Sequence, residues 1–268
     1  MKDILEEIIA WKRTEVEMQK KDMAPGILYK KVESMISDCT LQVRSMSHAL
    51  RDSPSGIIAE FKRKSPSKGW IKEEGKAEEI PVRYARNGAA AISILTDEKF
   101  FGGKTDFIRT ARPDVDIPIL RKDFIIDEYQ LLQARAIGAD AVLLIAAGLE
   151  KADCKRLAKT AHDLGLETLL EIHTESELDY VGEHIDMVGV NNRHLGTFHT
   201  DVENSYRLAA YLPPEYVRIS ESGISNPKTV KELREAGFRG FLIGETFMKE
   251  DNPAEALGKF IDEVISHK

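Results

Sequence analysis

Residues 141–172 read AVLLIAAGLEKADCKRLAKTAHDLGLETLLEI, and this stretch contains the pattern from which the fold can be predicted. A short apolar run, a longer amphipathic segment and a second short apolar run follow one another. That is the order of a β-strand, an α-helix and a parallel β-strand. Parallel strands need a crossover of this length, because the chain must return to the same end of the sheet before the next strand starts. The stretch therefore predicts one βαβ unit.

The same unit recurs from about residue 56 onward. The apolar runs start roughly 20 to 35 residues apart, which is the room that one strand, one helix and two short loops require. The eight runs are 57–61, 91–96, 117–122, 141–147, 167–172, 187–192, 217–222 and 240–244. Because no ninth run follows, we expect the sheet to close into an α/β fold of the (β/α)8 TIM-barrel type. Asp127 and Asn226 are expected to cap helices that end before Gly138 and Gly237, respectively.

The chain has 268 residues, close to the roughly 250 that one such barrel requires, so a single domain over 1–268 is expected. Residues 56–268 would form the barrel and residues 1–55 an N-terminal helical extension. An apolar stripe at Ile4, Leu5, Ile8 and Ile9 indicates that this extension packs against the barrel. Two placements remain open, because these helices could cover the bottom or edge of the barrel or lie over its mouth.

Composition narrows the class of protein. The net charge of -7 disfavours nucleic acid as a partner, because phosphate backbones are usually met by a basic surface. The two cysteines, Cys39 and Cys154, are far apart and fit no disulfide framework or zinc site. The N-terminus lacks the features of a signal peptide, and no apolar stretch approaches a membrane span. We therefore expect a cytoplasmic enzyme with no membrane association.

Charged and amide side chains stand where the predicted strands end. Catalytic groups of TIM barrels come from the carboxyl ends of several strands. The residues in these positions are Glu60, Lys62, Lys122, Glu171, Asn191 and Glu221. Side chains alternate along a strand, so Glu60 and Lys62 should point to the same side and be neighbours. Burying unpaired charges costs several kcal/mol or more, so converging charges here must be paired, hydrated or available to a ligand.

Glycines follow the last two predicted strands. TIM barrels often bind phosphate through the loops after strands 7 and 8, with a short helix N-terminus directed at the anion. Ser222, Gly223 and Gly244 occupy these positions, and glycine lets backbone N–H groups approach a ligand. Gly223 could equally form an ordinary turn. Together with Gly244 it favours a phosphate site.

With these residues collected, the chain resembles the indole-3-glycerol-phosphate synthase family over essentially its whole length. The segment EFKRKSPS at 60–67 is similar to the family's signature. Further matching segments, in order, are SILT at 93–96, FFGG at 100–103, LRKDF at 120–124, LEIH at 170–173, VNNR at 190–193 and ESGI at 221–224. His194 and Lys104 depart from the residues that the family often has at these positions, but neither replaces an expected catalytic group.

The resemblance implies conversion of 1-(2-carboxyphenylamino)-1-deoxyribulose 5-phosphate to indole-3-glycerol phosphate, with loss of carbon dioxide and water, in tryptophan biosynthesis. No metal or organic cofactor is implied. Lys122 would be the general acid at the ribulose carbonyl, its ammonium held by a carboxylate such as Glu60. Glu171 would handle protons during dehydration, and Lys62 would bind substrate anions and could share the acid role.

The remaining expected roles concern orientation and binding. Asn191 and Glu221 would orient hydroxyls and the lysines, and Arg193 would support the anionic substrate. Phosphate would be held at Ser65, Ser222, Gly223, Gly244 and Glu245. Phe101 and Phe124 would wall the pocket for the aromatic ring, although an aromatic residue at a strand end often serves packing alone.

Other functions account for fewer of these residues. His194 and His199 do not form a recognised metal motif, and the basic run at 62–68 suits a small anion better than nucleic acid. Another phosphate-binding barrel, such as phosphoribosylanthranilate isomerase or the tryptophan synthase α subunit, shares the fold but lacks the lysine motif after strand 1. A non-enzymatic scaffold barrel would not need the ring of ionisable residues. Association with other tryptophan-pathway enzymes stays possible.

Overall fold

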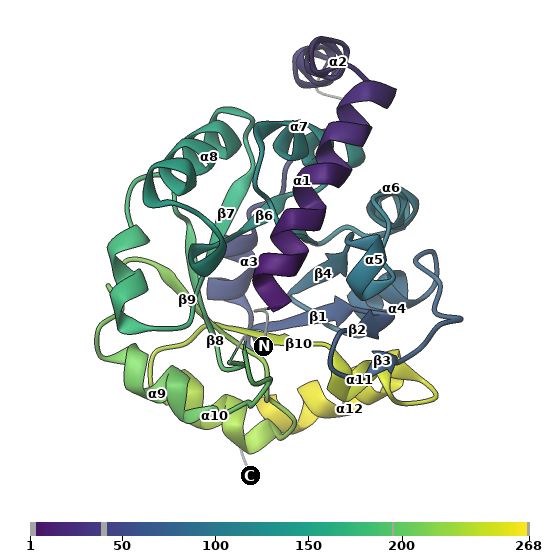
Figure 1. The fold of residues 1–268 in the computed structure, drawn as a ribbon. Helices are drawn as coiled ribbons and strands as arrows, with labels where there is room; N and C mark the ends of the chain where they lie inside the picture. Colours follow the sequence, from purple (N-terminus) through teal and green to yellow (C-terminus); the bar gives the residue numbers. More distant parts are fainter. Residues whose placement is uncertain (1–3, 39–41, 195, 267–268) are drawn as a thin grey trace.

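The computed structural model describes residues 4–38, 42–194 and 196–266. Eight parallel strands form a closed barrel in the order β1-β10-β9-β8-β7-β6-β5-β4 (Figure 1). The barrel strands are β1 (Ile57–Phe61), β4 (Ala91–Leu95), β5 (Ile119–Lys122), β6 (Ala141–Ile145), β7 (Glu167–Ile172), β8 (Met187–Asn191), β9 (Val217–Glu221) and β10 (Gly240–Ile243). All eight lie within the predicted runs, so the predicted (β/α)8 barrel is confirmed.

Helices cover the outside of the barrel and connect its strands. The α-helices of the barrel are α4 (Ile80–Arg86), α5 (Glu98–Phe101), α6 (Asp106–Ala111), α7 (Glu128–Ile137), α8 (Lys151–Asp163), α9 (Glu203–Ala209), α10 (Pro227–Glu235), α11 (Glu245–Met248) and α12 (Pro253–Ile265). Short 3-10 helices are η1 (Arg112–Asp114), η2 (Ala146–Gly148) and η3 (Glu175–Tyr180), and β2 (Lys64–Ser65) pairs with β3 (Gly69–Trp70) in a small hairpin. The connection between β7 and β8 contains η3 in place of an α-helix.

The expected helix caps are present. The Asp127 carboxylate accepts a hydrogen bond from Tyr129 N–H and, with Gln130, completes a capping box at the start of α7. Gly138 ends that helix in the left-handed conformation, with φ +91°. The Asn226 side chain caps α10 in the same way through Lys228 N–H. Local sequence was therefore sufficient to place both ends of α7 and the start of α10.

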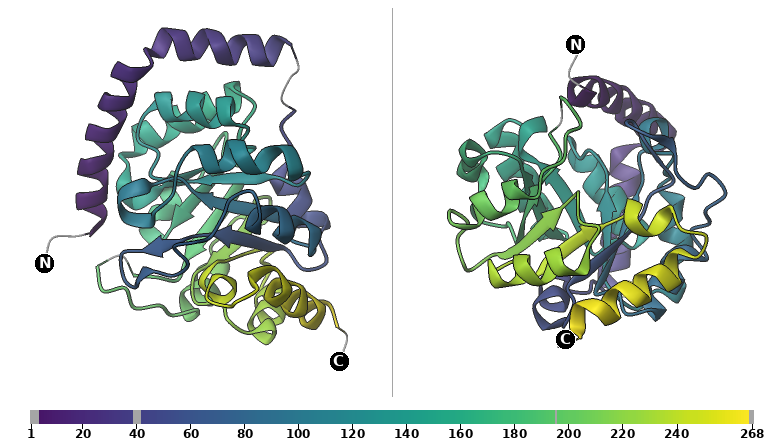
Figure 2. Two further views of the ribbon diagram at one scale, coloured as in Figure 1. Left: turned by 90° about the vertical axis from the view of Figure 1, so that its right-hand side faces the viewer. Right: turned by 90° about the horizontal axis from the view of Figure 1, so that it is seen from below.

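The N-terminal helices lie at two different ends of the barrel. Helix α3 (Met46–Asp52) places Met46 and Leu50 in the apolar barrel interior, and its N-terminal residues Ser45 and Ser47 hydrogen-bond to Glu167, where β7 begins. It therefore closes the amino-terminal end. Helix α1 (Ile4–Asp22) crosses the opposite end, and α2 (Pro25–Ser37) packs against α7 (Figure 2). Both placements considered from the sequence occur, each in a different helix.

Candidate active site

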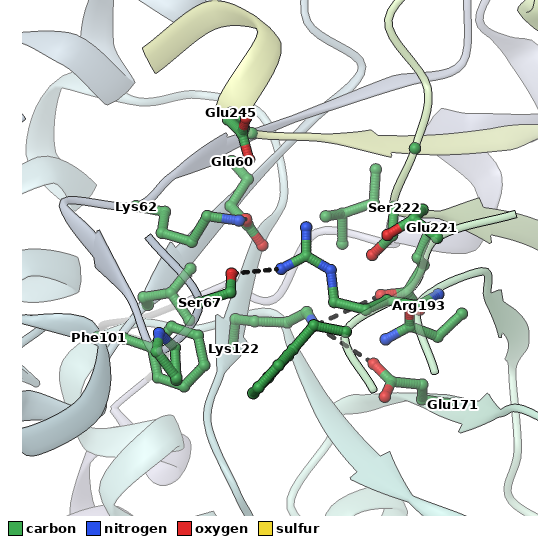
Figure 3. Close-up of a pocket in the computed structure, with 18 of the residues that line it drawn as sticks. Glu60, Lys62, Ser67, Phe101, Lys122, Glu171, Arg193, Glu221, Ser222 and Glu245 are labelled. Atoms are coloured by element: carbon green, nitrogen blue, oxygen red, sulfur yellow. Dashed lines mark hydrogen bonds and ion pairs between the residues drawn. The ribbon is translucent and has the colours of Figure 1, made fainter. Parts of the chain in front are cut away.

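A cavity of about 480 Å³ opens at the carboxyl ends of the barrel strands (Figure 3). Its lining includes all but one of the residues expected at the site. Those residues are Glu60, Lys62, Phe101, Lys122, Phe124, Glu171, Asn191, Arg193, Glu221, Ser222, Gly223, Gly244 and Glu245. The exception is Ser65, which is buried in the β2–β3 hairpin and is not part of the lining; its hydroxyl lies 3.5 Å from that of Ser67, which does line the cavity. Residues of all eight barrel strands thus line one space.

Five charged residues form the centre of the site, and we call Glu60, Lys62, Lys122, Glu171 and Glu221 the mouth cluster. The Lys62 ammonium lies 2.7 Å from Glu60 Oε1, as alternation along β1 predicted. Lys122 Nζ lies 3.3 Å from Glu171 Oε2 and 3.4 Å from Glu221 Oε2. The expectation that Glu60 holds Lys122 is therefore corrected. Glu60 is occupied by its neighbour on the same strand, while β7 and β9 supply the carboxylates for Lys122.

Burial and mutual attraction set the charge states of the mouth cluster. Burial by itself lowers the pKa of Lys122, but Glu171, Glu221 and Glu60 outweigh it and raise that pKa above its ordinary value. Burial opposes ionisation of Glu171 as well, yet Lys122 and His173 bring its pKa below the usual range. Glu221 behaves differently. Burial raises its pKa to about 8, because the attraction of Lys122 is offset by repulsion from Glu171 and Glu60.

The loops after β9 and β10 bring backbone close to the mouth cluster. Ser222 and Gly223 both have left-handed backbones, with φ +69° and +76°, at the turn after β9. A Cβ atom at Gly223 would lie 2.6 Å from Thr200 Cγ2, and one at Gly244 would lie 2.5 Å from Glu60 Oε1. Glycine is therefore required for the close approach at both positions. Helix α11 begins at Glu245, where the first N–H groups of a helix have no partner within the helix.

The Glu245 carboxylate does not itself bind an anion. It forms an ion pair with Lys68, across the cavity from the β1 side. On the same rim, Arg193 Nη1 donates a hydrogen bond to Ser67 Oγ at 3.2 Å, which joins the loop after β8 to the loop after β1. Glu245 can contribute a backbone N–H to an anion, whereas its side chain neutralises a lysine.

An apolar wall completes the cavity. The rings of Phe101 and Phe124 lie 5.9 Å apart between their centroids, on the side of the cavity that β4 and β5 form. Further lining residues were not expected from the sequence: Ile4, Leu5 and Ile8 of α1, Ser67 and Lys68 after β1, and Phe198 and Thr200 after β8. The sequence shows that this stripe of α1 is apolar, but the direction in which it points is set by how the helix packs on the barrel. Phe198 carried no signal in the sequence.

A second group of charges reaches the cavity lining at Asp123. We call its members, Lys12, Glu15, Asp97, Arg121 and Asp123, the anchor network. Lys12 of α1 is fully buried, with its ammonium 2.8 Å from Asp97 Oδ2, 2.9 Å from Asp123 Oδ1 and 3.0 Å from Glu15 Oε2. Arg121 Nη2 lies 3.0 Å from Asp123 Oδ2. The network fastens α1 to the ends of β4 and β5, one residue from Lys122.

In the part of the chain that the structure describes, no group of three or more His, Cys, Asp or Glu side chains is arranged to hold a metal ion. Across those same residues, none of the helices is both long and apolar enough to span a membrane.

Comparison with known proteins identifies the family of the chain. The family model for indole-3-glycerol phosphate synthase matches residues 5–260. An indole-3-glycerol phosphate synthase of Bacteroides thetaiotaomicron is 62% identical over 261 residues, covering 97% of this chain and 98% of its own length. One from a Polaromonas species is 40% identical over 264 residues, with coverages of 97% and 98%.

Solved structures of lower identity support the fold alone. A 3-hexulose-6-phosphate synthase of Salmonella typhimurium matches with a TM-score of 0.60 at 14% identity, covering 80% of this chain and 100% of its own. A tryptophan synthase α2β2 complex of Pyrococcus furiosus includes a chain that matches with a TM-score of 0.58 at 15% identity, with coverages of 80% and 98%. The family-model match and the sequence relatives decide the family. The chain belongs to the indole-3-glycerol phosphate synthase family, the carboxy-lyases that form indole-3-glycerol phosphate in tryptophan biosynthesis.

Proposed function

We propose that the cavity binds 1-(2-carboxyphenylamino)-1-deoxyribulose 5-phosphate and converts it to indole-3-glycerol phosphate, carbon dioxide and water. The observation that carries the proposal is the position of Lys122, whose ammonium faces the cavity between Glu171 and Glu221. An ammonium with partners on one side retains donor hydrogens for a ligand on the other. The Lys122 ammonium lies between the glycine loops at Ser222–Gly223 and Gly244 and the wall formed by Phe101 and Phe124. This arrangement suits a substrate with a phosphate at one end and a phenyl ring at the other.

Ring closure requires an acid at the ribulose carbonyl. Lys122 donates a proton to the carbonyl oxygen as the ring carbon that bears the carboxylate attacks the carbonyl carbon. Lys62, held by Glu60 at 2.7 Å, binds the anionic groups of the substrate. The new carbon–carbon bond leaves the attacking ring carbon tetrahedral, and loss of carbon dioxide from that carbon returns the electron pair of the broken bond to the ring.

Dehydration then removes the hydroxyl that the first step created. Glu171, which its lowered pKa keeps ionised at neutral pH, accepts the proton from the carbon beside the ring nitrogen, and Lys62, sharing the acid role, protonates the hydroxyl so that it leaves as water. Asn191 and Glu221 orient the substrate hydroxyls and the lysines. Loss of water completes the aromatic five-membered ring, and the gain in aromaticity favours the product.

Binding groups surround this centre. The backbone N–H groups around Ser222, Gly223, Gly244 and Glu245 hold the phosphate, and Arg193 supports the anionic substrate. Phe101 and Phe124 pack against the phenyl ring. Ser65 contributes indirectly, because its hydroxyl supports that of Ser67, which accepts a hydrogen bond from Arg193.

Residues 1–268 act as one barrel domain in this proposal. Support comes from α3, which lies in the barrel interior, and from Lys12 of α1, which is buried against two strand ends. A phosphorylated metabolite as the substrate is consistent with a cytoplasmic enzyme of the pathway.

Turnover of the purified protein tests the proposal directly. We expect indole fluorescence to appear when the carboxyphenylamino-deoxyribulose phosphate is added without metal. Phosphoribosylanthranilate, the substrate of the isomerase that shares this fold, provides the matched control and should not be consumed. Isomerase activity in the absence of indole formation would contradict the proposal.

A further inference from the structure

His173 lies one residue beyond β7 and takes no part in lining the cavity. Only 10% of its side chain is exposed. Its backbone carbonyl accepts a hydrogen bond at 3.1 Å from the side-chain amide of Asn204 on α9, which holds the chain in place at this point. A largely buried histidine directly behind the expected proton-handling carboxylate needs a physical explanation.

The imidazole ring is placed between two carboxylates. Its Nε2 lies 3.4 Å from Glu171 Oε1, and its Nδ1 lies 3.8 Å from Glu177 Oε2. Glu177 is itself held, because one of its oxygens accepts the backbone N–H groups of both His173 and Thr174 at the start of η3. A continuous series therefore runs from Glu177 through His173 and Glu171 to Lys122, whose Nζ lies 3.3 Å from Glu171 Oε2.

This placement favours the charged form of the ring. A neutral imidazole carries one N–H and one acceptor nitrogen, so one of the two carboxylates would face a lone pair. The ionisable groups that act on the ring are Glu171 on β7, Glu177 on η3 and Glu221 on β9, and all three are carboxyls. Burial lowers the pKa of His173, but hydrogen bonding to Glu177 and the electrostatic attraction of these carboxyls outweigh it and raise the pKa above its ordinary value.

We propose that His173, in its protonated form, is a positioning residue that keeps Glu171 ionised and correctly oriented while Lys122 gives up its proton. The inference rests on the proposed function, in which Lys122 becomes neutral when it protonates the ribulose oxygen. At that moment Glu171 loses the positive charge at its Oε2. Among the described residues, His173 is the other cationic group within 4 Å of Glu171. No proton moves to or from the ring, so the proton balance of the reaction is unchanged.

The pH dependence of turnover distinguishes this role from simple packing. We expect wild-type kcat to fall as the pH rises through the pKa of His173. The glutamine of His173→Gln is neutral at every pH, so this fall in kcat with rising pH should be absent in the variant. At low pH its kcat should be about tenfold lower than that of the wild type, while KM should change much less. His48→Gln, an exposed histidine on α3, is the matched control and should follow the wild type. A His173→Gln profile parallel to that of the wild type would overturn the inference.

The charge on the ring can also be measured without turnover. Nitrogen-15 NMR of labelled histidine side chains, with the His173 signal assigned by its loss in His173→Gln, should show an imidazolium at neutral pH. Glu177→Gln should lower the pKa of His173. A neutral ring in an active enzyme would overturn this inference alone, whereas a wild type that does not form indole would overturn the proposed function and the role of His173 with it.

Discussion

The mouth cluster and the anchor network are adjacent groups of buried charges that differ in how completely they are paired. In the anchor network, Lys12 and Arg121 lie 2.8–3.0 Å from their carboxylates. In the mouth cluster, Lys62 lies 2.7 Å from Glu60, but Lys122 lies 3.3 and 3.4 Å from Glu171 and Glu221.

The two groups meet at consecutive residues of one strand end, Lys122 and Asp123, which pair with different partners: Lys122 with Glu171 and Glu221, and Asp123 with Lys12 and Arg121. Full pairing in the anchor network leaves no capacity for a ligand and serves the attachment of α1. Incomplete pairing in the mouth cluster leaves donors and acceptors available in the cavity. Buried charge therefore stabilises the structure in the anchor network and is available for chemistry in the mouth cluster.

The largest expected effect comes from breaking the anchor network. Lys12→Met leaves Asp97 and Asp123 buried without that cation, which typically costs about 3 to 5 kcal/mol when one partner of a buried pair is removed. Urea unfolding should show this loss in the free energy of unfolding. Lys21→Met, an exposed lysine on the same helix, is the control and should change little. Equal stability of the two variants would refute the view that the network fastens α1.

The next effect concerns the mouth cluster. Lys122→Ala removes the proposed acid and should lower kcat on the order of a hundredfold or more, equivalent to about 3 kcal/mol in the activation barrier. Steady-state kinetics on the deoxyribulose phosphate measure it, with the exposed Lys151→Ala on α8 as control. An unchanged rate in Lys122→Ala would remove the assignment of this lysine as the acid.

The last pair of predictions concerns one carboxyl from each group, Glu221 and Asp123. Replacing each by its amide should change the free energy of unfolding in opposite directions at high pH. The pKa of Glu221 is raised to about 8, so the folded state gains a proton that the unfolded state lacks between roughly pH 4.5 and 8. The stability that this proton provides is complete below the unfolded pKa and is lost as the pH rises through 8. Glu221→Gln should therefore match the wild type near pH 5 and be about 1 to 2 kcal/mol more stable near pH 9.

Asp123→Asn is the counterpart in the anchor network. Burial opposes ionisation of Asp123, but Lys12 and Arg121 depress its pKa well below the usual range. Its contribution to stability is present above the unfolded pKa and is lost only in strong acid. The asparagine variant should therefore be less stable than the wild type at both pH 5 and pH 9. Chemical denaturation at the two pH values checks both variants, and effects of the same sign would show that the two groups do not differ as described.

Much of the site could be predicted because strand ends are recognisable in the sequence. Lys122, Glu171 and Glu221 each follow an apolar run, and parallel strands bring their carboxyl ends together whatever the loops do. The partner of Lys122 could not be predicted, since that depends on distances across the barrel between strands that are far apart in sequence. Lys12 and His173 were missed for the same reason. Their neighbours come from other elements, and no local pattern marks a helical lysine as buried or a histidine as charged.

The amino-acid sequence by itself determined the eight βα units, the order in which they close, the helix caps and the residue types that meet at one end of the barrel. These follow from local periodicity and from the fixed direction of side chains along a strand. Only the tertiary structure decided which carboxylate holds which lysine, that α3 closes one end while α1 borders the other, and which charges are fully paired. Electrostatic pairing falls off over a few ångströms, so it is set by how separate elements pack and not by their order along the chain.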